Sequence, residues 1–394
     1  MKRFVYADNA ATTPVSREVR EAMAPCFETV WGNPSSLHQK GREAKVLLDD
    51  ARLRIANVFH CTPKEIYFTS CGSESDNWAI KGAAHRMKKK GRDEIVTTAI
   101  EHHAVLHACE SLEREGFKVT YVGVDADGVV KMDELRAAVT EKTAIVAVMY
   151  ANNEIGTIEP IREICDIAHA KGALMFTDAV QAIGNLEINL SELPVDMLSL
   201  SGHKIHAPKG IGMLFIRKGV VIDNLIDGGG QERGKRGGTE NLPYIVGLAK
   251  ALEVAEEKMA DNERVARLRD RLIDGLTKIP HSRLHGHRTQ RLPGNVNVGF
   301  ECVEGESMLL WLDLAGICVS TGSACSSDSL EPSHVLIAIG IPHEKAHGSL
   351  RISISHETTD EDVDYILETV PPIVEKLRQM SPLWEDLQKQ EHNA

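Results

Sequence analysis

Short apolar runs alternate with amphipathic stretches between about residues 60 and 220 of the chain. We predict seven strands from these runs, at residues 66–69, 95–98, 119–122, 144–150, 174–177, 197–200 and 212–216. Helix-like stretches lie between most of them, and this alternation is typical of an α/β domain with a largely parallel sheet. Ligands of such sheets bind at the carboxyl ends of the strands, so we expect the functional side chains there.

A charged amphipathic stretch, residues 245–279, predicts a solvent-exposed helix that leads into a second region. That region has strand patterns at Asn295–Phe300 and Ser349–Ser353 and a closing helix at Asp360–Gln379. The polar tail, residues 381–394, is expected to be mobile.

A chain of 394 residues is too long for one compact core. We predict a large domain at residues 15–261 and a small α+β domain formed by residues 1–14 and 262–394.

The net charge of −12 argues against direct binding to nucleic acid. No apolar leader and no apolar run of membrane-spanning length occurs in the sequence, so we expect a cytoplasmic protein without membrane contact. The eight cysteines form no CxxC pair, which favours reduced thiols, and we expect no metal site.

Two turns have the composition of phosphate sites. Gly72 follows the first predicted strand, and Ser73 with Asp76 has the spacing of a helix-capping box, so a helix N-terminus could bind a phosphate there. A plain capped helix would give the same pattern. Ser201 and His203 follow the sixth strand and are placed to hold a phosphate as well.

Asp178 and Lys204 end or follow apolar strands. A strand-end carboxylate could pair with a pyridinium nitrogen, or it could cap the next helix. Lysine forms Schiff bases with carbonyl cofactors. Together with the two phosphate turns, these residues predict a site for pyridoxal 5'-phosphate.

At this point the sequence resembles the NifS/IscS-type cysteine desulfurases, which are class V enzymes of the pyridoxal-phosphate fold type I. The resemblance covers nearly the whole chain and is carried by residues 6–14, 32–36, 98–102, 152–156, 178–181, 201–204, 228–233, 320–325 and 330–333. It implies a mostly parallel seven-stranded sheet in the large domain, a smaller α+β domain and a homodimer.

The resemblance also implies roles for single residues. Lys204 would bind the cofactor and move protons, Asp178 would pair with the ring nitrogen, and Gln181 would bind the ring oxygen. His102 would stack on the ring and could act as acid or base, although His103 directly follows it and could take that place.

Further cofactor and substrate contacts are implied in the same way. The phosphate would be held by Gly72, Ser73, Ser201 and His203, and by Thr239 reaching across from a neighbouring subunit. The cofactor would also contact Asn153, which would bind the substrate carboxylate together with Arg351. The chain departs from the family pattern at Ser73, where threonine is usual, and at Cys71, where glycine is common.

Cys325 lies in a run of small polar residues that predicts an exposed loop on the small domain. An exposed thiolate is the reactive form of cysteine, so Cys325 is the expected nucleophile that takes sulfur from L-cysteine as a persulfide and leaves L-alanine. Cys318 lies in an apolar run and is expected in the core.

The resemblance implies that the sulfur supplies iron–sulfur cluster assembly, through a scaffold protein, or tRNA thiolation. Trp384, in the tail, could dock such a partner or could be a packing anchor. A selenocysteine lyase, a class V aminotransferase and a non-catalytic sulfur-relay scaffold are the alternative functions.

Overall fold

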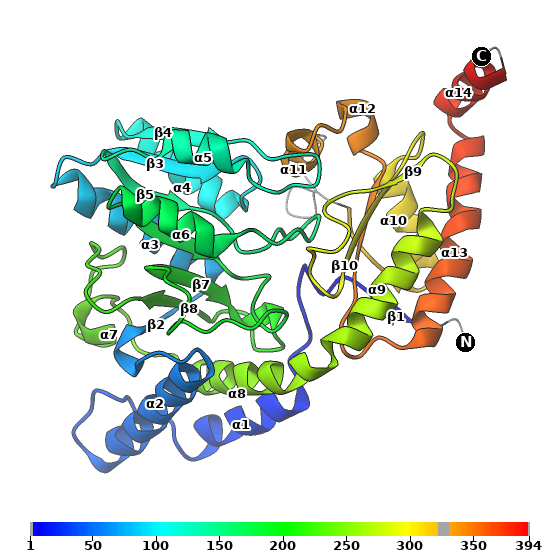
Figure 1. The fold of residues 1–394 in the computed structure, drawn as a ribbon. Coiled ribbons are helices and arrows are strands. Elements are labelled where there is room, and N and C mark those ends of the chain that lie inside the picture. Colours follow the sequence, from blue (N-terminus) through cyan, green and yellow to red (C-terminus); the bar gives the residue numbers. More distant parts are fainter. Residues whose placement is uncertain (1–2, 322–330, 393–394) are drawn as a thin grey trace.

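A seven-stranded sheet forms the centre of the structure, a computed structural model that describes residues 3–321 and 331–392 (Figure 1). Its strands lie in the order β2-β8-β7-β6-β5-β3-β4, and β8 is antiparallel to both of its neighbours while the other pairs are parallel. The strands are β2 (Ile66–Thr69), β3 (Glu94–Thr98), β4 (Lys118–Val122), β5 (Thr143–Ala147), β6 (Leu174–Asp178), β7 (Met197–Ser201) and β8 (Gly212–Ile216). The predicted α/β architecture is therefore confirmed.

Helices cover both faces of this sheet, and each face has its own apolar core. Successive residues of a strand point to opposite faces, so Ile145 and Val146 of β5 contribute to different cores. Strands buried on both faces read as continuous apolar runs, which is why the sequence predicted them so closely. The helices of this part are α1 (Arg17–Glu28), α2 (Gln39–Val58), α3 (Gly72–Lys88), α4 (His103–Arg114), α5 (Met132–Ala138), α6 (Ile161–Ala170), α7 (Gln231–Gly234) and α8 (Leu242–Lys258).

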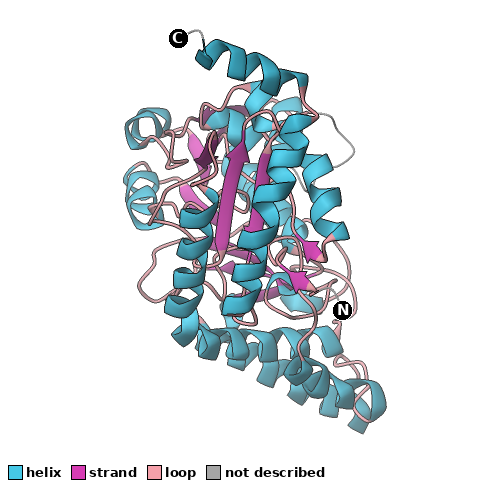
Figure 2. Cartoon of the chain, turned by 90° about the vertical axis from the view of Figure 1, so that its right-hand side faces the viewer, coloured by secondary structure: helices cyan, strands magenta, loops and turns pink. Residues whose placement is uncertain are grey.

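A three-stranded antiparallel sheet forms a second core with β9 (Ser282–Leu284), β10 (Asn295–Phe300) and β12 (Ser349–Ser353). Figure 2 shows long helices running side by side in front of strands, and α9 (Asn262–Leu276) and α13 (Asp360–Gln379) pack against each other here. The remaining elements are α10 (Gly305–Leu314), α11 (His334–Ala338), α12 (His343–Ala346) and a parallel pair formed by β1 (Val5–Tyr6) and β11 (Ile317–Cys318).

The N-terminal Val5 and Ala7 belong to this second core. The domain boundaries remain a prediction. The shared core supports the assignment of the N-terminal residues to the small domain. Among the described residues, no helix is both long enough and apolar enough to cross a membrane.

One sequence prediction about the helices was wrong. The stretch 245–279 is two helices, α8 and α9, and α8 is buried against α1 and α2 because nine of its residues face the core. The tail forms a further helix, α14 (Pro382–His392), whose Trp384 packs on His281 and Arg378 at ring distances of 5.3 and 4.5 Å. The structure therefore supports the packing role of Trp384.

A buried ion pair fixes the edge strand β2. The Arg52 guanidinium on α2 contacts the Glu232 carboxylate at 2.6 and 2.8 Å, and Glu232 also accepts from the Phe68 amide at 3.0 Å. Glu232 adopts a left-handed backbone, with φ of 45°, to reach this position. The 228–233 motif therefore serves the fold, because a side chain of α7 accepts a backbone hydrogen bond from the open edge of β2.

Removing one partner of a buried pair leaves the other charge without compensation, so Glu232→Gln should lower the free energy of unfolding by about 3 kcal/mol. Urea denaturation followed by circular dichroism measures this loss. Glu21→Gln is the matched control, because its pair with Arg17 is exposed and should change the free energy by less than about 0.5 kcal/mol. Equal effects of the two variants would contradict the structural role of Glu232.

Candidate active site

Strand ends and helix starts meet at one edge of the large sheet. Asp178 is the last residue of β6, Ser201 is the last residue of β7, and Gly72 and His103 begin α3 and α4. The parallel pairing of β6 with β7 places Asp178 opposite Ser199. The structure thus brings the two predicted turns and the predicted carboxylate to the same edge.

The start of α3 forms a close-fitting cradle. A Cβ atom on Gly72 would lie 3.0 Å from the Val180 side chain and 3.3 Å from the Ser201 Cβ, so only glycine leaves this space open. Cys71 caps the helix with extended backbone, φ of −170°, which any residue can adopt. Its departure from the family pattern therefore leaves the backbone geometry unchanged.

The predicted capping box is wrong. Ser70, rather than Ser73, bonds the first turn of α3, with its amide donating to Glu74 Oε2 at 2.7 Å. Asp76 points inward instead, where it is 1% exposed and accepts from the Ser199 hydroxyl at 2.5 Å. The spacing of Ser73 and Asp76 alone could not show whether the acidic side chain caps the helix or points into the protein.

Asp178 is a buried carboxylate with one backbone donor, the Val180 amide at 2.8 Å. Burial raises its pKa to about 6, while the Val180 amide and Lys204 oppose the shift. No helix lies between β6 and β7 among the described residues, so Asp178 caps a turn and not a helix, and the helix-capping alternative was wrong.

His102 lies beside this carboxylate. Its ring nitrogen and the carboxyl oxygens of Asp76 and Asp178 are all within 4.8 Å of one another. Nδ1 accepts from the Ala104 amide at 3.1 Å, and burial, with Lys204 next in effect, lowers the His102 pKa to about 4. The imidazole is therefore neutral at pH 7. His103 instead packs on other histidine rings, so the structure places His102 at the site.

The N-terminal segment forms the wall opposite β7. Lys204 Nζ donates to the carbonyls of Ala10 and Ala11 at 2.6 and 2.7 Å, and Gln181 Nε2 donates to Ala10 at 3.0 Å. His203 Nδ1 lies 3.1 Å from the Thr12 hydroxyl, and Lys204 contributes, after burial, to a His203 pKa lowered to about 4. Backbone carbonyls carry no sequence signal, so this wall could not be predicted.

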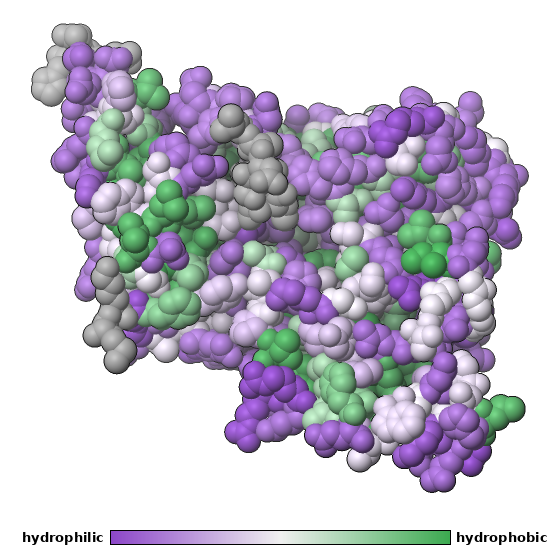
Figure 3. Space-filling view, turned by 180° about the vertical axis from the view of Figure 1, so that it is seen from behind, coloured by the Kyte–Doolittle hydropathy of each residue, from purple (hydrophilic) through white to green (hydrophobic). Residues whose placement is uncertain are grey.

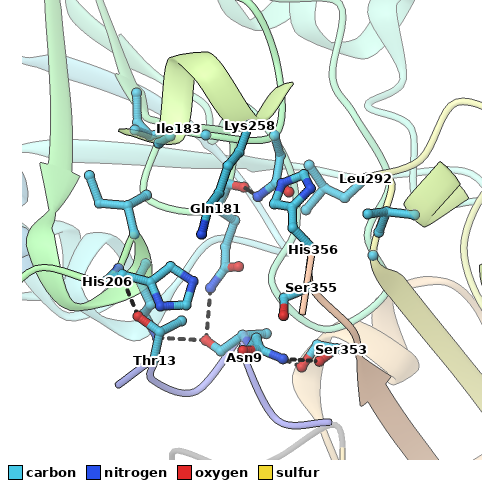
Figure 4. Close-up of a pocket in the computed structure, with 18 of the residues that line it drawn as sticks. Asn9, Thr13, Gln181, Ile183, His206, Lys258, Leu292, Ser353, Ser355 and His356 are labelled. Carbon is cyan, nitrogen blue, oxygen red and sulfur yellow. Dashed lines mark hydrogen bonds between the residues drawn. The ribbon is translucent and has the colours of Figure 1, made fainter. Parts of the chain in front are cut away.

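A cavity of about 90 Å³ extends from Lys204 and Gln181 toward the second sheet. Figure 4 shows its polar lining, in which Gln181 and Asn9 face each other and His206 and His356 stand on opposite sides. The lysine therefore lies where the two parts of the chain meet.

Arg351 and Asn153 lie together. Arg351 is 2% exposed, its Nη1 donates to the Asn153 carbonyl at 3.2 Å, and its Nη2 pairs with Asp8 at 3.1 Å. The Arg351 Nε has no partner among the described residues. Asp8 was missed because a single acidic residue in the N-terminal segment has no pattern of its own.

The three remaining predicted residues are Thr239, Cys325 and Cys318. Thr239 is exposed on the loop between α7 and α8. Cys325 lies outside the described residues. Cys318 is half-buried and lines a cleft of about 680 Å³ with Asp8 and Thr321, so its placement in the core was wrong.

Comparison with known proteins gives a consistent result. The profile of the aminotransferase class-V family matches residues 5–366. The chain is 56% identical over 382 residues to cysteine desulfurase IscS of Methanosarcina thermophila, covering 97% of this chain and 94% of the relative. It is 53% identical over 393 residues to cysteine desulfurase IscS of Clostridium botulinum strain Hall, covering 99% of each.

Solved structures agree with these sequence relatives. A NifS-like protein superposes with a TM-score of 0.89 at 42% identity, covering 95% of this chain and all of that one. SspA in complex with cysteine gives 0.79 at 35% identity, covering 90% and 99%. The predicted fold type and the resemblance to NifS/IscS-type enzymes are confirmed.

Glu101, directly before His102, gives a test of charge burial at this edge. Its Oε1 accepts from the Thr98 hydroxyl at 2.6 Å and the Met149 amide at 3.0 Å, and burial raises its pKa to about 8. Its folded pKa lies above the unfolded value, so the stability from this group is fully present below pH 4.5. That stability falls as the pH rises through about 8.

Glu101→Gln cannot ionise, so it should remove a few kcal/mol, in order of magnitude, of the decline in unfolding free energy between about pH 5 and 9. Urea denaturation at several pH values measures the slope, with the exposed Glu21→Gln as control. A slope identical to that of the wild type would show that Glu101 is already charged at neutral pH.

Proposed function

This chain belongs to the class-V aminotransferase family and is a cysteine desulfurase, and from that premise we propose how its residues divide the reaction. L-cysteine and the Cys325 thiol would give L-alanine and a Cys325 persulfide, so that sulfur is transferred and no outside oxidant is needed. The observation that carries the proposal is the convergence of Asp178, His102 and Lys204 at one sheet edge.

The cofactor of the proposed reaction is pyridoxal 5'-phosphate, and the site fits it. The open cradle at Gly72, beside Ser201 at the start of α3, suits a phosphate because free amides and the helix dipole favour an anion. Ser73 and His203 complete this set in the proposal. When bound, the cofactor withdraws electrons from the substrate Cα.

The other cofactor contacts have separate tasks. Asp178 would hold a proton on the ring nitrogen, Gln181 would bind the ring oxygen, and neutral His102 would stack on the ring without adding charge. Asn153 would contact the cofactor from the side of Arg351.

Lys204 would bind the cofactor and then carry the proton at the substrate Cα. Its ammonium donates hydrogen bonds to two backbone carbonyls, which can accept such bonds but cannot donate them. These acceptors fix the position of the amine at the meeting point of the two parts of the chain.

Arg351 would bind the substrate carboxylate with Asn153. A guanidinium matches a carboxylate in a bidentate way, and burial strengthens the pairing. The unpartnered Nε and the Nη2 that now contacts Asp8 are adjacent donors on one edge of the guanidinium. L-cysteine would take that edge in competition with the Asp8 carboxylate.

We further propose a cytoplasmic homodimer that passes sulfur to an iron–sulfur scaffold or a tRNA-thiolation protein. Phe27, Trp31 and Leu37, on α1 and the loop before α2, are 61, 66 and 91% exposed. Figure 3 shows apolar surface on the lower part of the molecule. A second copy of the chain would cover such surface. Thr239, which is exposed on the loop between α7 and α8, would reach the phosphate bound by the partner subunit.

Cys325→Ala should lower sulfide and persulfide formation by about 10³-fold or more, because the substitution removes the proposed sulfur acceptor. The visible absorption of bound cofactor should remain. Alanine and sulfide release are measured from L-cysteine with a reductant, and Cys318→Ala is the matched control that should keep turnover. Full activity of Cys325→Ala would exclude the persulfide route and favour an aminotransferase or lyase.

Lys204→Ala should abolish turnover and remove the absorption band of lysine-bound pyridoxal phosphate, because the covalent attachment is lost. The ultraviolet–visible spectrum of the purified protein measures it, with Lys209→Ala as the control on the same loop. A purified wild-type protein that stays colourless after incubation with pyridoxal phosphate would contradict the cofactor assignment.

A further inference from the structure

A second buried carboxyl group lies behind Asp178. Asp76, on the inward face of α3, is 1% exposed, and its carboxyl lies within 4.8 Å of the Asp178 carboxyl and the His102 ring. Its described donor is the Ser199 hydroxyl at 2.5 Å, from the β7 residue that pairs with Asp178 in the sheet. The proposed function gives Asp76 no role.

Two carboxylates this close and this buried cannot both be ionised at moderate cost, since each charge is desolvated and repels the other. The groups around them decide which one keeps a proton. Asp178 faces the Val180 amide and the Lys204 ammonium, and both favour its charged form. Asp76 faces the Asp178 carboxylate, whose charge opposes ionisation, while the Ser199 hydroxyl favours it. Burial and the Asp178 charge raise the Asp76 pKa well above its usual value.

We propose that Asp76 is a protonated, neutral acid whose hydroxyl group faces the Asp178 carboxylate and keeps that carboxylate ionised. Ser199 donates to one Asp76 oxygen, which leaves the other oxygen to carry the proton. The pair then holds one proton and a single negative charge. Asp76 is thus a positioning residue that acts through Asp178.

The consequence for the cofactor rests on the proposed function, whereas the proton assignment does not. A donor behind Asp178 stabilises its charged form, and a charged Asp178 holds a proton on the ring nitrogen. An asparagine amide could offer Asp178 an N–H donor that does not titrate, while alanine could offer no donor. Comparing these two variants therefore separates a neutral donor from a charged group.

The infrared carbonyl band of protonated carboxyl groups tests the proton directly. At pH 6 the full-length protein should lose the intensity of one group in Asp76→Asn. Glu159→Gln is the matched control, because burial raises the Glu159 pKa to about 8 at a position outside the site, so it should lose the same intensity. A band that is unchanged in Asp76→Asn but reduced in Glu159→Gln would overturn the proposal.

The pH dependence of the visible absorption tests the link to Asp178 in the holoenzyme. Asp76→Ala should lower the midpoint by about half a pH unit or more, since Asp178 loses its donor and part of its charge. Asp76→Asn should restore the wild-type midpoint, and Glu159→Gln should not move it. If Asp76 were charged, Asn and Ala would shift the midpoint equally, and that result would overturn the proposal. A colourless wild type would instead contradict the cofactor, while the infrared band would still decide the state of Asp76.

Discussion

Three carboxyl groups at the carboxyl edge of the large sheet, those of Asp76, Glu101 and Asp178, are almost completely removed from water, and this desolvation raises the pKa of each one. The His102 imidazole is neutral at pH 7 because burial and Lys204 both disfavour its cation. Asp178 keeps a charge more easily than Asp76 because a backbone amide and an ammonium lie beside it. A site built this way would present one anion, one cation and an uncharged imidazole face to the ring of the proposed cofactor.

The sheet itself creates that environment. Two apolar cores, one on each face, bury nearly all residues of the central strands β5, β6, β7 and β8, so these strands appear as apolar runs and could be read from the sequence. The burial of helix α8, by contrast, could not be read from its sequence. Its residues such as Glu253 and Lys250 are charged, yet its other face is buried by α1 and α2, which lie far away in sequence. Local pattern predicts an amphipathic helix, but it cannot say how much of the helix other elements will cover.

The same limit applies to the site. Asp178, Ser201 and Lys204 could be predicted because each follows an apolar run, which places it at a strand end. Asp76 was misread as a helix cap because its partner Ser199 is 123 positions away. Asp8 pairs with Arg351 across 343 positions and was missed altogether. Side chains whose role depends on one distant contact leave no periodic signal, whereas those fixed by local secondary structure do.

The N-terminal segment shows why such distant contacts matter for chemistry. Asn9 Nδ2 donates to the Ser353 carbonyl of the small sheet at 2.7 Å, and the next two residues accept from Lys204 on the large one. The Thr13 hydroxyl then donates a hydrogen bond to the His203 carbonyl at 2.9 Å. A shift of β12 relative to β7 would therefore pull on the carbonyls that orient the lysine. Arg351, also on β12, pairs with Asp8 of the same segment. The N-terminal segment therefore contacts both the group proposed to hold the substrate carboxylate and the group proposed to move the substrate proton.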